Sequence, residues 1–473
     1  MPSTSQQELS KRLEGHFLHV PTDGQERLIE AFPRFLLSDK PRCTLLVKGY
    51  AGTGKTTSIG AIVRTLIEIR KTFIMLAPTG RAAKVMASYS GVNAHTIHRC
   101  IYKAQTGADG ERGYKIAENK FKNAVFIVDE ASMIGADDGL LEDLMQYVFS
   151  VKGCRLILVG DGAQLPPVGC VLSPALDLAY MKTRFDLTIA EVELTEVVRQ
   201  ELNSSILINA HSLRVCIDGL DPGSRASVPK IDIEAGPDVI KLSVEDLQET
   251  IESLHSKYGE DGVVIVTRSN KRAVLFNQQI RKRILWQEDE INIGDRLMVV
   301  KNNYYWLKEY DEISDELIAN GDIVEVVRIL DRFDRYGYEF AEVDVVLVEL
   351  ENSPHLSLTI MTTFLNDNKP SLSIAENKEL FKKIADDYLD LRNKSKIHAA
   401  VIRDQCYQAL QVKYAYSLTC HKAQGGQWPA IILDQGFITE ENMDREWLRW
   451  LYTGFTRAVS ELYLLNFNQK FFK

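Results

Sequence analysis

The residues with the clearest chemical capacity lie in segment 49–56, GYAGTGKT, which matches the phosphate-binding pattern G-x-x-x-x-G-K-[ST] at every fixed position. Glycines in this pattern leave backbone N–H groups free to surround phosphate oxygens. Lys55 can reach the β- and γ-phosphates, and the Thr56 hydroxyl can ligate Mg²⁺. The sequence therefore predicts a nucleoside triphosphate site with Mg²⁺. Its expected contacts are Gly52, Thr53, Gly54, Lys55, Thr56 and Thr57.

Two adjacent acids supply the second half of the predicted chemistry. The apolar run 124–128 ends directly in Asp129 and Glu130. Behind a phosphate loop, the first acid of such a pair holds Mg²⁺ through a water molecule. The second acid can orient and polarise the water that attacks the γ-phosphate. Asp129 and Glu130 together predict hydrolysis of the nucleotide and not binding alone.

Two glutamines are further candidates for contact with the nucleotide. Gln25 precedes the phosphate loop, and its amide can both donate to and accept from an adenine ring. A solvated glutamine at the start of a helix explains the same position equally well. Gln164 lies in a loop that Pro166 and Pro167 stiffen, where it is placed to sense the γ-phosphate.

Polar side chains after two further segments indicate contact with a nucleic-acid backbone. Thr79 follows the apolar run 72–77, and ligands of open α/β sheets sit beyond the C-terminal ends of the strands. An ordinary strand-to-helix loop is the alternative. His95 and His98 could suggest a metal, but no third ligand is near them in the sequence. We therefore favour contact of Thr96 and His98 with a sugar-phosphate strand.

A histidine and a lysine near the C-terminus allow two interpretations. His421 and Lys422 have no acidic neighbour in the sequence, and no nucleophile motif accompanies them. A histidine general base is therefore the weaker interpretation. We favour contact of Thr419, His421 and Lys422 with a DNA backbone.

The elements that must position these residues alternate between strands and helices. Loop 49–56 lies between an apolar run at 45–47 and a segment, 59–67, with apolar residues at helical spacing. Further strands are predicted at residues 72–77, 124–128 and 155–159, and a second group at 263–266, 431–433 and 462–465. This alternation predicts an α/β fold with ligands at the C-terminal ends of its strands.

Two segments interrupt the alternation. Residues 99–121 are predicted to form a β-hairpin with a polar tip. Residues 285–410 contain two strand starts after tight turns, at 294–300 and 320–326, and two further strands near 341–350 and 357–361. An amphipathic helical pattern over 380–389 follows. We expect both segments to be insertions into the α/β framework.

Composition and charge limit the class of protein. The chain has 473 residues, of which 45% are hydrophobic and 26% charged, as in a globular protein of roughly two to four domains. We expect no signal peptide and no membrane span. The seven cysteines form no C-x-x-C pair, which predicts a reducing, cytoplasmic setting. The net charge of −9 argues mildly against nucleic acid, although positive charge can cluster locally.

The order of the motifs resembles the superfamily 1 helicases. The similar segments are 49–56, 129–132, 160–168, 194–200, 416–427 and 452–458. The run HKAQG at 421–425 and the run TIH at 96–98 are most similar to the RecD/Dda type, superfamily 1B. The matching motifs span nearly the whole chain.

The resemblance implies a fold of two RecA-like P-loop NTPase domains. A β-hairpin would be inserted in the first domain, and an SH3-like β-barrel plus a helical arm in the second. The expected ranges are 1–190 for motor domain 1 with its hairpin at 99–121, 191–284 and 411–473 for the two parts of motor domain 2, and 285–410 for the barrel and arm.

The resemblance also implies the activity. ATP would bind in the cleft between the two domains, and Arg199 and Arg457 would reach the γ-phosphate from the second domain, with a surface salt bridge as the alternative for each. The implied partners are single-stranded DNA and its junctions with duplex. We expect a monomeric motor that moves 5′→3′ and uses the hairpin as a pin. Single-strand-binding, replication or repair proteins are expected further partners.

Three other functions stay open at this level. One is a translocase that strips proteins from a strand with little unwinding, and another is an ATP-switched binding module without processive motion. The third is a motor on RNA. No clustered acidic nuclease motif lies outside the predicted ATP site, so we do not expect strand cleavage.

Overall fold

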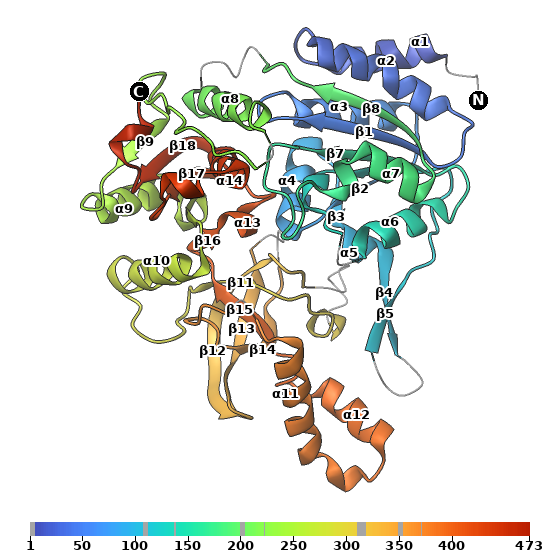
Figure 1. The fold of residues 1–473 in the computed structure, drawn as a ribbon. Coiled ribbons are helices and arrows are strands. Elements are labelled where there is room, and N and C mark those ends of the chain that lie inside the picture. Colours follow the sequence, from blue (N-terminus) through green and yellow to red (C-terminus); the bar gives the residue numbers. More distant parts are fainter. Residues whose placement is uncertain are drawn as a thin grey trace.

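The computed structural model describes residues 5–106, 112–136, 139–198, 204–221, 223–309, 318–348, 353–369 and 371–473. Within these ranges the chain forms two parallel β-sheets, a closed β-barrel and a projecting β-hairpin (Figure 1). The predicted fold class, an α/β protein of two RecA-like sheets with hairpin and barrel insertions, is confirmed. The hairpin tip, residues 107–111, and Arg199 lie outside the described residues.

In the described residues the first sheet has six strands, all parallel, in the order β3-β2-β6-β7-β1-β8. Its strands are β1 (Cys43–Gly49), β2 (Phe73–Ala77), β3 (Ala94–Thr96), β6 (Val125–Val128), β7 (Arg155–Gly160) and β8 (Thr188–Leu194). The central strands are buried on both faces, which explains their continuous apolar sequences. β8 pairs with β1 as far as Leu194, so this sheet runs past residue 190, the expected end of motor domain 1.

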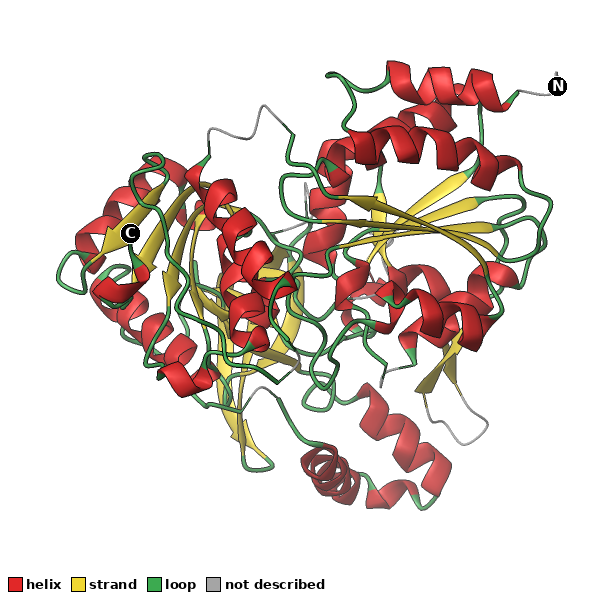
Figure 2. Cartoon of the chain, turned by 45° about the horizontal axis from the view of Figure 1, so that its top comes forward, coloured by secondary structure: helices red, strands yellow, loops and turns green. Residues whose placement is uncertain are grey.

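Helices cover both faces of the first sheet (Figure 2). One core contains side chains of α1 (Gln6–Gly15), α2 (Asp23–Leu37), α3 (Lys55–Glu68) and α4 (Gly80–Ser90). The core on the opposite face contains side chains of α5 (Ile97–Ile101), α6 (Leu140–Phe149) and α7 (Leu178–Phe185). The hairpin strands β4 (Tyr102–Thr106) and β5 (Arg112–Ile116) follow α5 and project away from the sheet (Figure 1).

The described residues form a second parallel sheet of five strands, in the order β16-β10-β17-β18-β9. Its strands are β9 (Val239–Leu242), β10 (Val263–Thr267), β16 (Ser417–Thr419), β17 (Trp428–Asp434) and β18 (Ala458–Leu465). Helices α8 (Ser205–Asp218) and α14 (Arg445–Phe455) pack on one face. Helices α9 (Leu247–Tyr258) and α10 (Asn270–Arg283) pack on the other, and the short helix α13 (Cys420–Ala423) follows β16.

The closed barrel is inserted in the chain between strands β10 and β16 of the second sheet. Its strands are β11 (Arg296–Val299), β12 (Ile323–Arg335), β13 (Tyr338–Leu347), β14 (Leu356–Met361) and β15 (Leu410–Tyr414). The sequence indicated the first four; the closing strand β15 returns after the arm and runs past the expected barrel end at 410. The barrel interior and the α9/α10 side of the second sheet form one continuous core, which joins the barrel firmly to that sheet.

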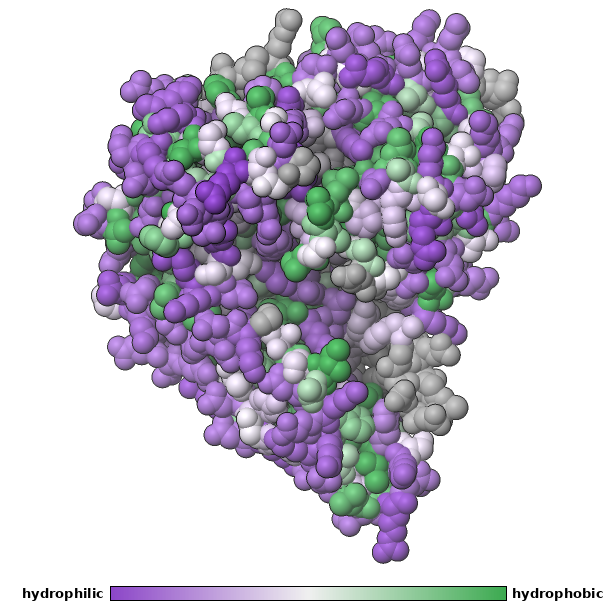
Figure 3. Space-filling view, viewed as in Figure 1, coloured by the Kyte–Doolittle hydropathy of each residue, from purple (hydrophilic) through white to green (hydrophobic). Residues whose placement is uncertain are grey.

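The helical arm consists of α11 (Ile374–Asp387) and α12 (Lys394–Arg403). It packs on the barrel through a separate apolar cluster that includes Phe340, Leu380 and Val401. Figure 3 shows that one face of the molecule is mostly hydrophilic, with small, separate hydrophobic patches. Among the described helices none combines the length and apolar character needed to cross a membrane. All seven cysteines lie in the described ranges and are unbridged.

Candidate nucleotide site and nucleic-acid interface

The phosphate loop joins β1 to α3 in the way its sequence predicts. Gly52 and Gly54 have φ angles of +74° and +78°, a left-handed conformation that glycine adopts without strain. Gly54 directly precedes α3, so the loop lies at the positive end of the helix dipole, which favours an anion. Lys55 Nζ donates to the carbonyl of Tyr50 at 2.8 Å and lies 3.7 Å from Asp161 Oδ2. The ammonium group is therefore held at the loop, beside an acid.

The predicted acids follow β6 at the C-terminal edge of the same sheet. Asp129 accepts hydrogen bonds from the Tyr89 hydroxyl at 2.7 Å and the Glu130 N–H at 2.8 Å. Burial raises the pKa of Asp129, and these bonds oppose the rise together with Lys55. Burial also raises the pKa of Glu130; Arg457 opposes that rise and Asp129 adds to it. A carboxylate with a raised pKa is suited to take a proton from water.

A cavity of about 660 Å³ joins these groups to residues of the second sheet. Eight residues of the predicted nucleotide site line it from the first half of the chain: Gly52, Gly54, Lys55, Thr56, Thr57, Asp129, Glu130 and Gln164. Residues of the second half of the chain that line it include Pro237, Asp238, Gln427, Thr456 and Arg457. One cavity therefore brings together the phosphate loop, the acid pair and a guanidinium from the other sheet.

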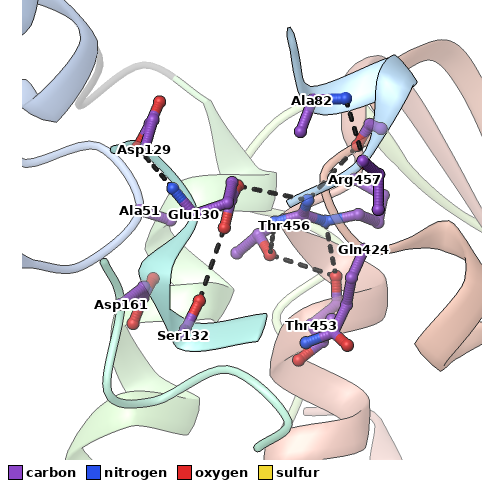
Figure 4. Close-up of polar contacts among 12 residues, drawn as sticks. Ala51, Ala82, Asp129, Glu130, Ser132, Asp161, Gln424, Thr453, Thr456 and Arg457 are labelled. Carbon is purple, nitrogen blue, oxygen red and sulfur yellow. Dashed lines mark hydrogen bonds and ion pairs between the residues drawn. The ribbon is translucent and has the colours of Figure 1, made fainter. Parts of the chain in front are cut away.

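Arg457 faces the acid pair across this cavity. Its Nη1 lies 3.8 Å from Oε1 of Glu130, and Ser132 Oγ lies 3.5 Å from the other Glu130 oxygen (Figure 4). Arg457 is 3% exposed, and its guanidinium donates to the carbonyls of Thr453 and Gly426, both at 3.3 Å. Helix α14 and the loop after α13 thus hold the guanidinium in place, while its charge is directed at Glu130.

Tyr452 connects the two sheets, although we did not predict a role for it. Its hydroxyl accepts from the N–H of Ala51 in the phosphate loop at 2.7 Å and donates to Asp161 Oδ2 at 2.8 Å. Burial and the nearby Asp161 carboxylate raise the pKa of this phenol. Tyr452 lies in segment 452–458 and Asp161 in segment 160–168, both of which resemble helicase motifs. The motifs did not indicate that these two side chains would meet.

The loop after β7 is held against the same helix. The N–H of Leu165 donates to Thr453 Oγ1 at 2.9 Å, and Gln424 Nε2 donates to the Leu165 carbonyl at 2.7 Å. Gln164 is 4% exposed, and its Oε1 has no hydrogen-bond partner. The predicted γ-phosphate sensor thus lines the cavity with a free acceptor.

Two described residues of the predicted nucleotide site, Gln25 and Thr53, do not line the cavity. Gln25 is fully buried, and its Nε2, which has no partner, lies 2.4 Å from the position a Cβ would take at Gly54. Its Oε1 accepts from the Thr22 N–H in a capping box at the start of α2. Thr53 is also buried and donates to the Tyr50 carbonyl at 2.8 Å. Arg199 is outside the described residues.

The donor set suits a cation held partly by phosphate. Among the described residues no group of three or more His, Cys, Asp or Glu side chains could hold a metal by itself. The groups that line the cavity instead include the hydroxyl of Thr56 and the carboxylate of Asp129, the two predicted Mg²⁺ ligands. Mg²⁺ is bound in this manner in many nucleotide sites, by one or two protein oxygens together with substrate phosphates and water.

The predicted DNA contacts of the first sheet lie at the ends of two adjacent strands. β2 pairs with β3, with Ala77 opposite Thr96. Thr79 caps α4 by accepting from the Ala82 N–H at 3.2 Å, and Thr96 caps α5 by accepting from the Arg99 N–H at 3.2 Å. Thr96 is 1% exposed, so in this conformation its hydroxyl serves the helix and is closed to a ligand.

The predicted DNA contacts of the second sheet follow β16. Thr419 precedes α13 without capping it through its side chain. Lys422 Nζ donates to Asn320 Oδ1 of the barrel at 2.9 Å. Burial lowers the pKa of both His421 and Lys422. A histidine with a lowered pKa is neutral near pH 7, so His421 can contact a strand as a hydrogen-bonding group and not as a cation.

The two groups of DNA contacts meet at a close approach between the sheets. A Cβ at Gly425 would lie 2.9 Å from Ala82 Cβ and 3.2 Å from Thr79 Oγ1. Only glycine permits this approach, and its φ of +73° also requires glycine. Thr79 of the first sheet therefore lies directly beside the segment that follows α13 of the second.

Two family models match the chain. The model of the AAA domain matches residues 22–215, and the model of the UvrD-like helicase C-terminal domain matches residues 414–465. The first contains the phosphate loop and the acid pair, and the second contains Arg457. The matched regions thus carry the two walls of the cavity.

Curated relatives show the same similarity over different lengths. The ATP-dependent RecD2 DNA helicase of Deinococcus radiodurans is 32% identical over 277 residues, 55% of this chain and 34% of that protein. The ATP-dependent DNA helicase dda of Enterobacteria phage T4 is 27% identical over 446 residues, 88% of this chain and 92% of that protein. The chain therefore spans about a third of the first relative and nearly all of the second.

Among solved structures, a Pif1 helicase from Bacteroides in complex with ADP-AlF3 and single-stranded DNA has a TM-score of 0.48 and 15% sequence identity. The alignment covers 96% of this chain and 95% of that one.

Proposed function

Because this chain belongs to the RecD/Dda type of superfamily 1B and is an ATP-dependent DNA helicase, we propose that it moves 5′→3′ along single-stranded DNA and unwinds the duplex ahead of it. One observation carries the proposal: a single cavity joins Lys55 and Glu130 of the first sheet to Arg457 of the second. A nucleotide in this cavity contacts both sheets at once, so its presence can change how they sit against each other.

The chain's own residues account for the hydrolysis step. Lys55 and the loop N–H groups bind the β- and γ-phosphates of ATP. Glu130 in its ionised form takes a proton from the attacking water. Arg457 stabilises the negative charge that spreads over the transferred phosphoryl group. Mg²⁺, when bound by Thr56 and through water by Asp129, neutralises charge on the same phosphates.

Coupling to DNA follows from the contacts that lie beside the cavity. α14 carries Tyr452 and Thr453, which hold the phosphate loop and the loop after β7, and it leads directly to Arg457. The close approach of Gly425 to Thr79 places the DNA contacts next to this interface. Opening and closing of the cavity therefore changes the spacing between the two groups of DNA contacts, which moves the strand.

The direct test uses ATP turnover and tailed duplexes. We expect single-stranded DNA to raise ATP hydrolysis and RNA of the same sequence to raise it less. A duplex with a 5′ single-stranded tail should be unwound, and a duplex with only a 3′ tail should not. Unwinding that depends on a 3′ tail would refute the proposed direction. ATP turnover that does not respond to DNA would refute the motor and favour an ATP-switched binding module.

A further inference from the structure

A second cavity, of about 510 Å³, lies outside the ATP site and the predicted DNA contacts. Both insertions build it: the hairpin contributes Tyr114, and the barrel insertion contributes Lys301 and Tyr304 after β11 and Asn377 of the arm. We call it the insertion cavity. Its volume is within the range of roughly 300–1,000 Å³ that is usual for sites that enclose a small molecule.

Aromatic rings form one part of its lining. The rings of Tyr114 and Tyr304 have centroids 3.8 Å apart and planes inclined by 31°, so the hairpin and the segment after β11 meet through two tilted phenol rings in close contact. Tyr305 and Tyr407 also line the cavity. Aromatic faces of this kind hold nucleobases by stacking, with little dependence on base identity.

The polar part of the lining consists of amides and one cation. Asn302, Asn320, Asn377 and Gln408 are among six amide side chains, and the described lining contains no carboxylate. Lys301 is the cation, with Nζ 3.4 Å from Asn377 Oδ1, and burial lowers its pKa. In a chain of net charge −9, a lining without acids suits a polyanionic ligand. Asn and Gln side chains can both donate to and accept from base edges.

The position of the cavity connects it to the strand. Asn320, which lines it, accepts a hydrogen bond from Lys422, one of the predicted DNA contacts. Tyr114 belongs to β5 of the hairpin, which is the predicted pin. A nucleotide that passes from the hairpin to Lys422 therefore passes residues that line this cavity.

We propose that the insertion cavity binds one unpaired base of the DNA strand, stacked on Tyr304 and contacted at its edge by the surrounding amides. The inference rests on the proposed function for the identity of the ligand as DNA. The cavity would hold the base after it leaves the duplex and before its phosphate reaches Lys422. It would thereby oppose re-pairing of the strand behind the hairpin.

The test measures the affinity of a 5′-tailed fork by fluorescence anisotropy at one fixed salt concentration, with an abasic residue placed at each position of the tail and junction in turn. At one position near the junction, removal of the base should weaken binding by the wild-type chain roughly five-fold or more. Tyr304→Ala should weaken binding of the intact fork to a similar degree. Because both changes remove the same contact, their combination should cost little more than either alone.

Three variants complete the test. Tyr304→Phe keeps the ring and should behave as wild type. Tyr114 is 43% exposed, so the Tyr114→Ala variant should fold normally. In this variant, the same abasic residue should weaken binding of the fork less than it does in the wild-type chain. Tyr336→Ala removes a half-buried tyrosine of the barrel that does not line the cavity and should leave the effect unchanged.

Two results would overturn the inference. One is that no position depends on its base while the fork still stimulates ATP hydrolysis. The other is that, at every position, the loss of binding free energy from the abasic residue and the loss from Tyr304→Ala are fully additive. If DNA fails to stimulate ATP hydrolysis by the wild-type chain, the proposed function itself falls, and this inference falls with it.

Discussion

Arg457 Nη1 lies 3.8 Å from Glu130 Oε1, although the two residues belong to different sheets. The contact places a guanidinium opposite the carboxylate that we propose as general base, with the phosphate loop lining the same cavity. A γ-phosphate bound by Lys55 would lie between these charges. A bound nucleotide must therefore rearrange the Arg457–Glu130 ion pair.

Arg457→Lys should lower kcat for ATP hydrolysis by about 10³-fold or more, because an ammonium lacks the planar fork that spreads charge over the phosphoryl oxygens. ATP affinity, measured with a fluorescent analogue, should change far less. Arg449→Lys is the matched control. Arg449 lies on α14, the helix that leads to Arg457, donates to the Val171 carbonyl at 2.5 Å and is not among the described residues that line the cavity. Equal losses in both variants would argue for a structural role of Arg457.

Glu130→Gln should keep ATP binding and slow hydrolysis by about 10²-fold or more, because the amide cannot accept the proton of the attacking water.

Lys55→Ala should abolish turnover and also weaken ATP binding, because the ammonium contacts the phosphates in the ground state. Binding and single-turnover hydrolysis should be measured separately. Normal hydrolysis in both variants would exclude this cavity as the ATP site.

The pH dependence of kcat should report the raised pKa of Glu130. Burial raises this pKa, with Asp129 adding to the rise and Arg457 opposing it. The ionised form is the active one, so the rate should fall as the pH falls through the raised pKa, above the value of about 4.3 for an exposed glutamate. Glu130→Gln should lose this acid limb. An acid limb at or below pH ~4.3 would contradict the assignment.

Tyr452→Phe should lower the free energy of unfolding by about 1–3 kcal/mol, because it leaves the Ala51 N–H without its partner and removes one hydrogen bond from the buried Asp161 carboxylate. Urea unfolding measures the change. Tyr463→Phe is the control, because it removes a tyrosine–carboxylate bond of 2.7 Å at a partly exposed site and should cost less than about 0.5 kcal/mol. Equal effects would show that Tyr452 does not link the sheets.

Deletion of residues 103–115 should reduce unwinding and leave DNA-stimulated ATP hydrolysis in place. The reason is that this segment contributes the hairpin strands and the Tyr114–Tyr304 contact but no described residue of the ATP cavity. Unwinding of a 5′-tailed duplex and ATP turnover should be measured on the same preparation. Unchanged unwinding would contradict the pin and favour a translocase that acts on bound proteins.

The sequence determined the parts of this protein whose chemistry is local. The phosphate loop, the acid pair after β6 and the helix that follows the loop are each set by contiguous residues, because glycine conformations and strand ends depend on near neighbours. The buried parallel strands were readable for the same reason, since burial on both faces makes each one a continuous apolar run. The hairpin and most of the barrel followed from turns and alternation.

The tertiary structure decided which distant groups meet. The pairing of Tyr452 with Ala51 and Asp161 depends on how α14 packs against another sheet, and no spacing in the sequence encodes that distance. Gln25 has the right chemistry for adenine, but its capping of α2 buries it under Gly54. β15 closes the barrel only after the arm has returned the chain to β11. Residue types thus fixed what each group can do, and long-range packing fixed which groups can do it together.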